Sequence, residues 1–116
     1  MNDTCLFCRI LSGNIPCSKV YEDDRVLAFK DIHPQAPVHV LVIPRKHIAT
    51  LDDVGTEDAA LMGHLMERLA HVARLAGVAE AGYRTIINCR AHGGQEVFHL
   101  HAHILGGHPM GPMTVR

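Results

Sequence analysis

Three histidines recur at every second position near the end of the chain, where His99, His101 and His103 alternate with apolar residues. Successive side chains of an extended strand point to opposite faces, so the pattern predicts a strand over residues 97–105 with three imidazoles on one face. The opposite face would carry Phe98, Leu100, Ala102 and Ile104. Near neutral pH an imidazole can act as a nucleophile, carry a proton or bind a metal ion. The sequence therefore predicts a functional face on this strand.

Two chemistries could use this face: a three-histidine metal site with an open position, and nucleophilic catalysis by one histidine. Alternate side chains on a strand lie about 6.5–7 Å apart, whereas histidine ligands lie about 2.0–2.1 Å from a zinc ion. One straight row of histidines therefore fits a single metal ion poorly. We expect His101, the middle histidine, to attack the substrate while its neighbours position it. A merely solvated face would explain two alternating histidines better than three.

The composition is that of one ordinary domain. The 116 residues are 47% hydrophobic and 20% charged, which predicts a single domain over residues 1–116. The formal net charge is -1, with both signs mixed along the chain, so we expect neither a nucleic acid nor an anionic membrane as partner. No apolar run reaches the roughly 20 residues that span a bilayer, and the first residues lack the pattern of a secretory signal. The sequence therefore predicts a cytoplasmic protein.

Hydrophobic periodicity predicts an α+β fold: an antiparallel sheet of about five strands with one long helix and a short amino-terminal helix. The expected elements are a helix over 5–11 capped by Asp3 or Thr4, hairpin strands over 17–21 and 25–29, a strand over 38–43 buried on both faces, a helix from Thr56 to Gly77, a strand over 83–88 that pairs with the histidine strand, and an irregular tail over 106–116.

His39 is the polar residue within the apolar run over 38–43. A buried imidazole costs free energy unless it finds a hydrogen-bond partner. We therefore expect His39 to face the other histidines. His64 and His71 fall within the long helix, where a surface or boundary position is the ordinary expectation.

The run from His99 to Leu105 resembles the signature of the histidine-triad (HIT) family, in which three histidines alternate with apolar residues. The following Gly106-Gly107 resembles the Hint branch, the bacterial-type purine nucleoside phosphoramidases, rather than the diadenosine-polyphosphate hydrolases. Further segments are similar to Hint sequences in order and spacing, at residues 15–16, 21–24, 27–29, 31–32, 34–37, 42–44, 46–48 and 93–95. The resemblance covers nearly the whole chain.

This resemblance implies a HIT-like homodimer that hydrolyses the P–N bond of purine nucleoside 5'-phosphoramidates through a nucleotidyl-histidine, with no catalytic metal required. His101 would be the nucleophile, His99 and His103 would flank it, and His39 would support the same site. Asp31 would bind the ribose hydroxyls. The purine would lie against Leu6, Phe7, Ile10 and Ile32, and the phosphate would be held by Asn88 and by the backbone of Gly94, Gln95, Glu96 and Val97.

These roles also have physical reasons of their own. The Gly93-Gly94 turn lets backbone N–H groups approach an anion, and a carboxylate at Asp31 on a proline-bounded loop can accept from two vicinal hydroxyls. The leaving amine must depart protonated, which assigns proton transfer to His103 or His99. Glu96 stands where many relatives have a serine; because a carboxylate would repel the phosphate, we expect its side chain to point away.

Cys5 and Cys8 form a C-x-x-C pair on one face of the first helix. The pair resembles a zinc-bearing part of the wider family, in which the ligands match Cys5, Cys8, His47 and His99. Such a Cys₂His₂ set would be closed and structural. The alternative is that both cysteines are small buried apolar residues.

Two other functions remain open at the level of sequence. One is hydrolysis or transfer on a dinucleoside polyphosphate, which is disfavoured because Gly106-Gly107 resembles the Hint branch. The other is a nucleotide-binding or scaffolding module in which catalysis is incidental. The intact histidine motif around His101 disfavours this alternative.

Overall fold

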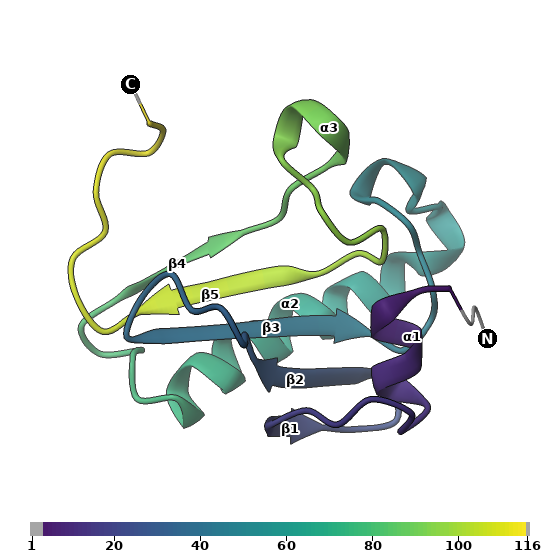
Figure 1. Cartoon of the computed structure of the whole chain (residues 1–116), viewed down its shortest axis with the longest axis horizontal. Coiled ribbons are helices and arrows are strands. Elements are labelled where there is room, and N and C mark those ends of the chain that lie inside the picture. The colour runs from purple at the N-terminus through teal and green to yellow at the C-terminus, as the bar shows by residue number, and fades with distance from the viewer. Residues whose placement is uncertain (1–3, 116) are drawn as a thin grey trace.

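A five-stranded antiparallel sheet forms the centre of the protein, in a computed structural model that describes residues 4–115 (Figure 1). The strands lie in the order β1-β2-β3-β5-β4, so β3 is central, β2 and β5 flank it, and β1 and β4 are the edges. Their bounds are β1 Lys19–Glu22, β2 Val26–Lys30, β3 Val38–Pro44, β4 Tyr83–Ile86 and β5 Ala102–Gly106. The predicted α+β fold, with one long and one short helix, is confirmed.

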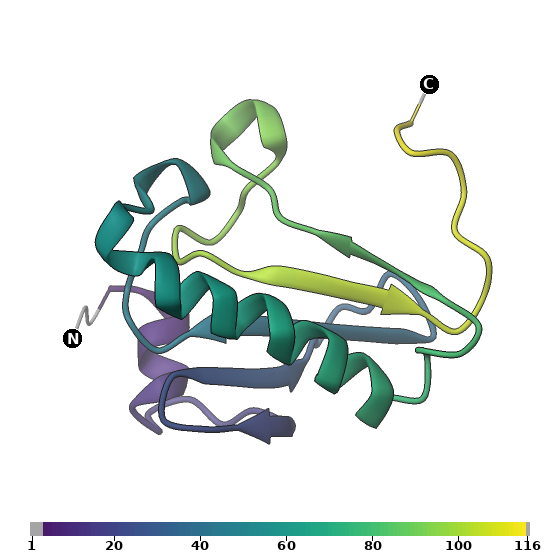
Figure 2. The same ribbon diagram turned by 180° about the vertical axis from the view of Figure 1, so that it is seen from behind.

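One face of the sheet is covered by the long helix α2 (Ala59–Leu75), which crosses the strands in Figure 2. Two short 3-10 turns, η1 (Leu51–Asp53) and η2 (Thr56–Asp58), lead into it. Leucines and small apolar residues at helical spacing face the sheet, where alternate strand residues complete a buried core. The core includes Leu65, Leu69, Val72 and Ala73 of α2 with Val26, Ala28, Val40, Val42, Ala102 and Ile104 of the sheet.

The other face is covered at one end by the short helix α1 (Leu6–Leu11). We expected Asp3 or Thr4 to cap it; instead Cys5 is the N-cap, and its Sγ accepts from the N–H of Cys8 at 3.4 Å. Asp3 lies outside the described residues. The helix buries Phe7 and Cys8 against alternate residues of the sheet, namely Leu27, Phe29, Leu41 and Ile43. The predicted double burial of β3 is therefore confirmed.

The expectation of one regular histidine strand over 97–105 is wrong, because β5 begins only at Ala102 and residues 97–99 bend. The reason lies in the hydrogen bonds: the N–H of Leu100 donates to the carbonyl of Ile48 at 2.6 Å, and the ring of His99 reaches the carbonyl of Pro44 at 2.8 Å. This segment is thus hydrogen-bonded to the last residue of β3 and to the chain that follows it. Phe98, expected on the buried face, is 48% exposed.

Several other boundaries differ slightly from those expected. β4 ends at Ile86, and a short helix α3 (Arg90–Gly93) that the sequence pattern did not indicate precedes the histidines. β4 pairs with β5 as predicted, with Ile86 opposite His103. Gly106 belongs to β5, and residues 107–115 contain no helix or strand. Within residues 4–115 no helix combines the length and apolar character needed to cross a membrane.

The β1–β2 turn is tied to α2 through Asp23. The carboxylate accepts from the N–H groups of Arg25 and Val26 at 2.8 Å and from the hydroxyl of Tyr21 at 2.7 Å. Nε2 of His64, on α2, lies 2.7 Å from the same carboxylate. Partial burial raises the pKa of Asp23, but these hydrogen bonds outweigh it and hold the pKa well below its ordinary value. His64 is therefore a structural boundary residue.

Replacing Asp23 with alanine should lower the free energy of unfolding by about 2 kcal/mol, because several donors, most of them partly buried, lose a charged acceptor. Its exposed neighbour Asp24 provides the matched control, and Asp24→Ala should change stability by less than about 0.5 kcal/mol. Urea denaturation followed by circular dichroism measures both. Equal losses in the two variants would contradict this account of the turn.

Candidate active site

Four imidazoles gather on the face of the sheet that carries α1. Side chains alternate along β3 and β5, so those of His39 and His103 share this face with Leu41. The ring centroids of His101 and His103 lie 5.0 Å apart, and those of His39 and His103 lie 5.1 Å apart. His39, His99 and His101 are all buried. The structure thus brings together the histidines that the sequence singled out.

His101 is held in one tautomer by the backbone. Its Nδ1 lies 2.8 Å from the carbonyl oxygen of His99. A carbonyl oxygen can only accept, so the ring proton sits on Nδ1 and the lone pair on Nε2. Burial lowers the pKa of His101, which favours the neutral ring. The edge of Phe7 packs on this ring at 5.1 Å between centroids. Nε2 of His101 is therefore a neutral nitrogen nucleophile.

His39 and His103 form a hydrogen-bond chain with a fixed direction. The N–H of Gln35 donates to Nδ1 of His39 at 3.0 Å, which leaves the ring proton of His39 on Nε2. That Nε2 lies 2.9 Å from Nδ1 of His103, which must accept. The ring proton of His103 therefore sits on its Nε2. His39 faces another histidine, as predicted.

Burial favours these neutral rings. Burial lowers the pKa of His39, although the charge of Asp31 opposes it. The pKa of His103 falls to about 4, first through burial and then through the neighbouring rings of His101 and His39. In the free protein at neutral pH each ring therefore carries one proton, and only the Nε2 proton of His39 lies between the two rings.

His99 directs both ring nitrogens away from this group. Its Nε2 donates to the carbonyl of Pro44 at 2.8 Å, so Nδ1 carries the lone pair. Nδ1 lies 3.4 Å from Sγ of Cys5, 3.6 Å from Sγ of Cys8 and 3.2 Å from Nδ1 of His47. The ring is fully buried and burial lowers the pKa of His99 to about 4, which keeps it neutral.

The donor set Cys5, Cys8, His47 and His99 has the dimensions of a tetrahedral zinc site. All four ligand atoms lie within 4.8 Å of one another, and Nδ1 of His47 is 3.3 Å from Sγ of Cys8. With Zn–S of about 2.3 Å and Zn–N of about 2.0–2.1 Å, tetrahedral geometry sets S···N and N···N distances at about 3.3–3.6 Å. Two thiols and two neutral imidazoles are also the chemistry that zinc prefers.

A second group, Asp31, His39 and His103, also brings three possible ligand atoms within 4.8 Å. Its hydrogen bonds oppose metal binding. Nδ1 of His39 accepts from a backbone N–H, so Nε2, the atom that faces the group, carries the proton and has no lone pair for a cation. We therefore assign this group to proton chemistry.

The loop before the histidines contains the short helix α3 and two residues with positive φ. α3 projects from the end of the sheet (Figure 1), begins at Arg90 with φ of 61° and is closed by Gly94 with φ of 81°. The left-handed region is uncommon for a residue other than glycine, and the Arg90 guanidinium is paired with Asp52 at 3.0 Å and with Asp53 at 3.5 Å. These contacts join the loop to η1.

Not every predicted phosphate donor in this loop is available. The N–H groups of Gly94 and Gln95 are engaged within the loop, with the carbonyls of Ala91 and Arg90. The N–H groups of Glu96 and Val97 make no hydrogen bond within residues 4–115. Those two are therefore the backbone groups left to meet an anion.

The buried side chain of Gln95 shapes the loop rather than facing a ligand. Its Oε1 accepts from the N–H of Arg90 at 2.8 Å, and its Nε2 donates to the carbonyls of Ala49 and Val97 at 2.8 and 3.0 Å. The sequence did not reveal this role, because the partners are distant in the chain. Glu96 is exposed, and Asn88 is half-buried with its backbone close to Gly93.

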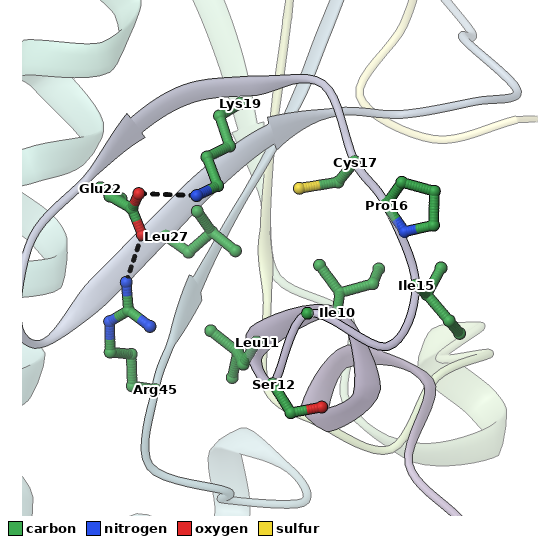
Figure 3. Close-up of a pocket in the computed structure, with 11 residues that line it drawn as sticks. Ile10, Leu11, Ser12, Ile15, Pro16, Cys17, Lys19, Glu22, Leu27 and Arg45 are labelled. Carbon is green, nitrogen blue, oxygen red and sulfur yellow. Dashed lines mark hydrogen bonds and ion pairs between the residues drawn. The ribbon is translucent and has the colours of Figure 1, made fainter.

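The four residues expected around the purine are only partly brought together. Phe7 is buried beside His101, whereas Leu6 is 44% and Ile32 85% exposed. Ile10 lines a separate cavity of about 300 Å³ between α1 and the β1–β2 hairpin. Figure 3 shows Ile10, Leu11 and Cys17 around that cavity, with the ion pairs of Glu22 to Lys19 and Arg45 at its side. A base slot on Ile10 is thus the weakest of the predicted contacts.

Comparison with known proteins points to one family. Residues 12–110 match the family model described as HIT domain. The chain is 48% identical over 113 residues to the purine nucleoside phosphoramidase of Escherichia coli (strain K12), covering 97% of this chain and 95% of that protein.

Solved structures agree with this assignment. A HIT family hydrolase from Legionella pneumophila is 50% identical with a TM-score of 0.90, covering 92% of this chain and 96% of that one. A HIT family hydrolase from Clostridium thermocellum is 45% identical with a TM-score of 0.94, covering 99% and 100%. These likenesses confirm the predicted family: the chain belongs to the HIT family, as a HIT-family hydrolase.

Proposed function

We propose that the protein hydrolyses the P–N bond of purine nucleoside 5'-phosphoramidates. The observation that carries the proposal is the opposite tautomers of two adjacent rings: Nε2 of His101 bears a lone pair, and Nε2 of His103 bears a proton. One attacks and the other protonates a leaving group. The name of the E. coli relative, purine nucleoside phosphoramidase, supports the substrate class.

In the first step Nε2 of His101 attacks the α-phosphorus, forming an N–P bond as the P–N bond to the leaving amine breaks. The leaving nitrogen keeps the bonding electron pair and takes a proton from Nε2 of His103, which for this step carries a second ring proton in the substrate complex and ends as a neutral imidazole. We assign this proton to His103 because both ring nitrogens of His99 are directed elsewhere. His99 then positions His101 through its carbonyl group.

In the second step water attacks the phosphorus and displaces His101. The proton that water loses returns to Nε2 of His103, which restores the starting state. Charge on the phosphoryl oxygens is stabilised by the N–H groups of Glu96 and Val97 and by the side chain of Asn88. Asp31 accepts from the ribose hydroxyls, and Phe7, with Leu6 and Ile32, provides apolar contacts for the purine.

We further propose a structural zinc ion held by Cys5, Cys8, His47 and His99. The distances and donor types described above fit it, and bound zinc would cross-link α1 to the sheet without entering the reaction. Catalysis requires no metal in this scheme, because the residues around His101 supply the nucleophile and the proton.

We propose that the protein is a homodimer joined at β4. β4 is an edge strand, and Tyr83 on it is 37% exposed. On α2 the buried Leu65 faces the sheet, and His64, about 100° to one side of it, contacts Asp23 at the β1–β2 turn. Met66, about 100° to the other side of Leu65, therefore lies on the β4 side. Met66 is 61% exposed. An unpaired strand edge beside exposed apolar side chains is the surface that a second copy would cover.

His101→Ala should lower the rate of hydrolysis of adenosine 5'-phosphoramidate by about a thousandfold or more. His92→Ala, an exposed histidine on α3, serves as the matched control and should keep the wild-type rate. Phosphorus NMR or chromatography of released AMP measures both. Cleavage of diadenosine polyphosphates in preference to the phosphoramidate, or full activity of His101→Ala, would overturn the proposal.

Protein purified without a tag or chelator should contain about one zinc ion per chain, because four ligands complete a structural site. Cys8→Ala should lose the metal and unfold at a lower temperature, whereas Cys17→Ala should keep it. Atomic emission spectroscopy and thermal denaturation are the measurements. Much less than one zinc ion per chain in the wild-type protein would contradict the proposed zinc site.

In solution the mass should be twice the 12.7 kDa of one chain. Met66→Glu places a charge on the proposed interface and should shift the population to monomers. Arg74→Glu, at an exposed position on the same helix, should leave the dimer intact. Light scattering or sedimentation gives the mass. A wild-type monomer at micromolar concentration would contradict the dimer.

A further inference from the structure

The carboxylate of Asp31 is fixed against the histidine chain by its own loop. Its Oδ1 accepts from the N–H of His33 at 2.8 Å, a short-range turn that sets the orientation of the side chain. Its Oδ2 lies 3.4 Å from Nε2 of His39. The same carboxylate that would bind the ribose therefore also faces the pair of rings that handles the proton.

A second proton on this pair needs an acceptor. In the neutral pair the Nε2 proton of His39 points at Nδ1 of His103. If Nδ1 of His103 also takes a proton, two N–H groups face one another. His39 cannot shift its ring proton from Nε2 to its own Nδ1, because Nδ1 of His39 already accepts from the N–H of Gln35. Oδ2 of Asp31 is the acceptor within reach to which His39 can then donate.

The charges around His103 also indicate a role for Asp31. The titratable groups that act on it are His101 on its own segment, His39 on β3 and Asp31 on the β2–β3 loop, while β4 places the apolar Ile86 opposite. Burial, His101 and His39 all lower the pKa of His103, and Asp31 is the group that raises it. Lys19 and Lys30 line a groove with Asp31.

We propose that Asp31 is, besides a ribose ligand, a positioning residue for the acid step: the His39–His103 pair, neutral in the free protein, takes up a second proton in the substrate complex, and the negative charge of Asp31 favours that proton. The inference rests on the proposed phosphoramidase reaction. His103 as an imidazolium gives its Nε2 proton to the leaving nitrogen as the P–N bond breaks, and becomes neutral. Asp31 gains and loses no proton; it stabilises the cation and accepts from His39.

The test is Asp31→Asn, whose Oδ1 still accepts from the N–H of His33 while the charge is removed. Substrates are adenosine 5'-phosphoramidate and 2',3'-dideoxyadenosine 5'-phosphoramidate, which lacks the ribose hydroxyls. At pH 7 we expect kcat to fall about tenfold on both substrates, since a charge at this distance shifts a pKa by about one pH unit or more. A residue that only binds ribose would raise KM on the first substrate alone and leave the second unaffected.

The pH profile provides the second readout. The active form has His103 protonated, so kcat falls as pH rises through the pKa of His103 in the complex. Without Asp31 that fall should move to lower pH by about one pH unit, so the defect shrinks as the pH is lowered. Asp31→Glu should restore part of the profile, and Asp24→Asn should match wild type. Identical pH profiles for wild type and Asp31→Asn would overturn the inference.

The outcomes separate this inference from the proposed function. Wild type that cleaves neither substrate refutes the phosphoramidase proposal itself. An active wild type with an Asp31→Asn defect confined to KM refutes only the role in proton transfer. Imidazole NMR of the free proteins adds a readout that needs no substrate: the His103 resonances should titrate at lower pH in Asp31→Asn. If Asp31→Asn unfolds, Asp31→Ser retains a short acceptor for the turn and replaces it in each measurement.

Discussion

The arrangement of the site depends on the partners of three polar groups of His99: its carbonyl oxygen and its two ring nitrogens. Its carbonyl oxygen accepts from Nδ1 of His101, its ring Nε2 donates to Pro44, and its ring Nδ1 faces the two cysteines and His47. The residue is fully buried, so each of these groups would cost free energy if left without a partner. One residue thereby links the nucleophile, through its backbone, with the end of β3 and the first helix, through its ring.

This linkage explains why a short helix of six residues can lie firmly on the sheet. Helices of this length are unstable alone in water. α1 instead buries Phe7 and Cys8, and Phe7 packs edge-on against Phe29, His99 and His101. A zinc ion held as proposed would add a cross-link at the same point. Stability of α1 and orientation of the catalytic ring are thus produced by one set of contacts.

The fold was predictable from sequence because apolar residues repeat at two for strands and at three to four for α2, and prolines and glycines separate them. For the site, the sequence predicted which histidines and cysteines lie together, but not the purine contacts or which loop N–H groups are free. The backbone at 97–101 was not: alternating apolar and polar residues are typical of a strand, yet hydrogen bonds to Ile48 and Pro44 bend it. α3 and the buried bonds of Gln95 depend on contacts far along the chain, which periodicity does not record.

What the structure adds to the sequence motif is the direction of each proton. Three imidazoles in a row are chemically equivalent until something fixes their tautomers. A backbone carbonyl does so for His101, placing its proton on Nδ1, and a backbone N–H does so for His103 by way of His39, placing its proton on Nε2. An acceptor at one end and a donor at the other therefore give neighbouring rings opposite properties. Because the main chain cannot change its donor or acceptor character, these assignments are built into the fold rather than left to the side chains.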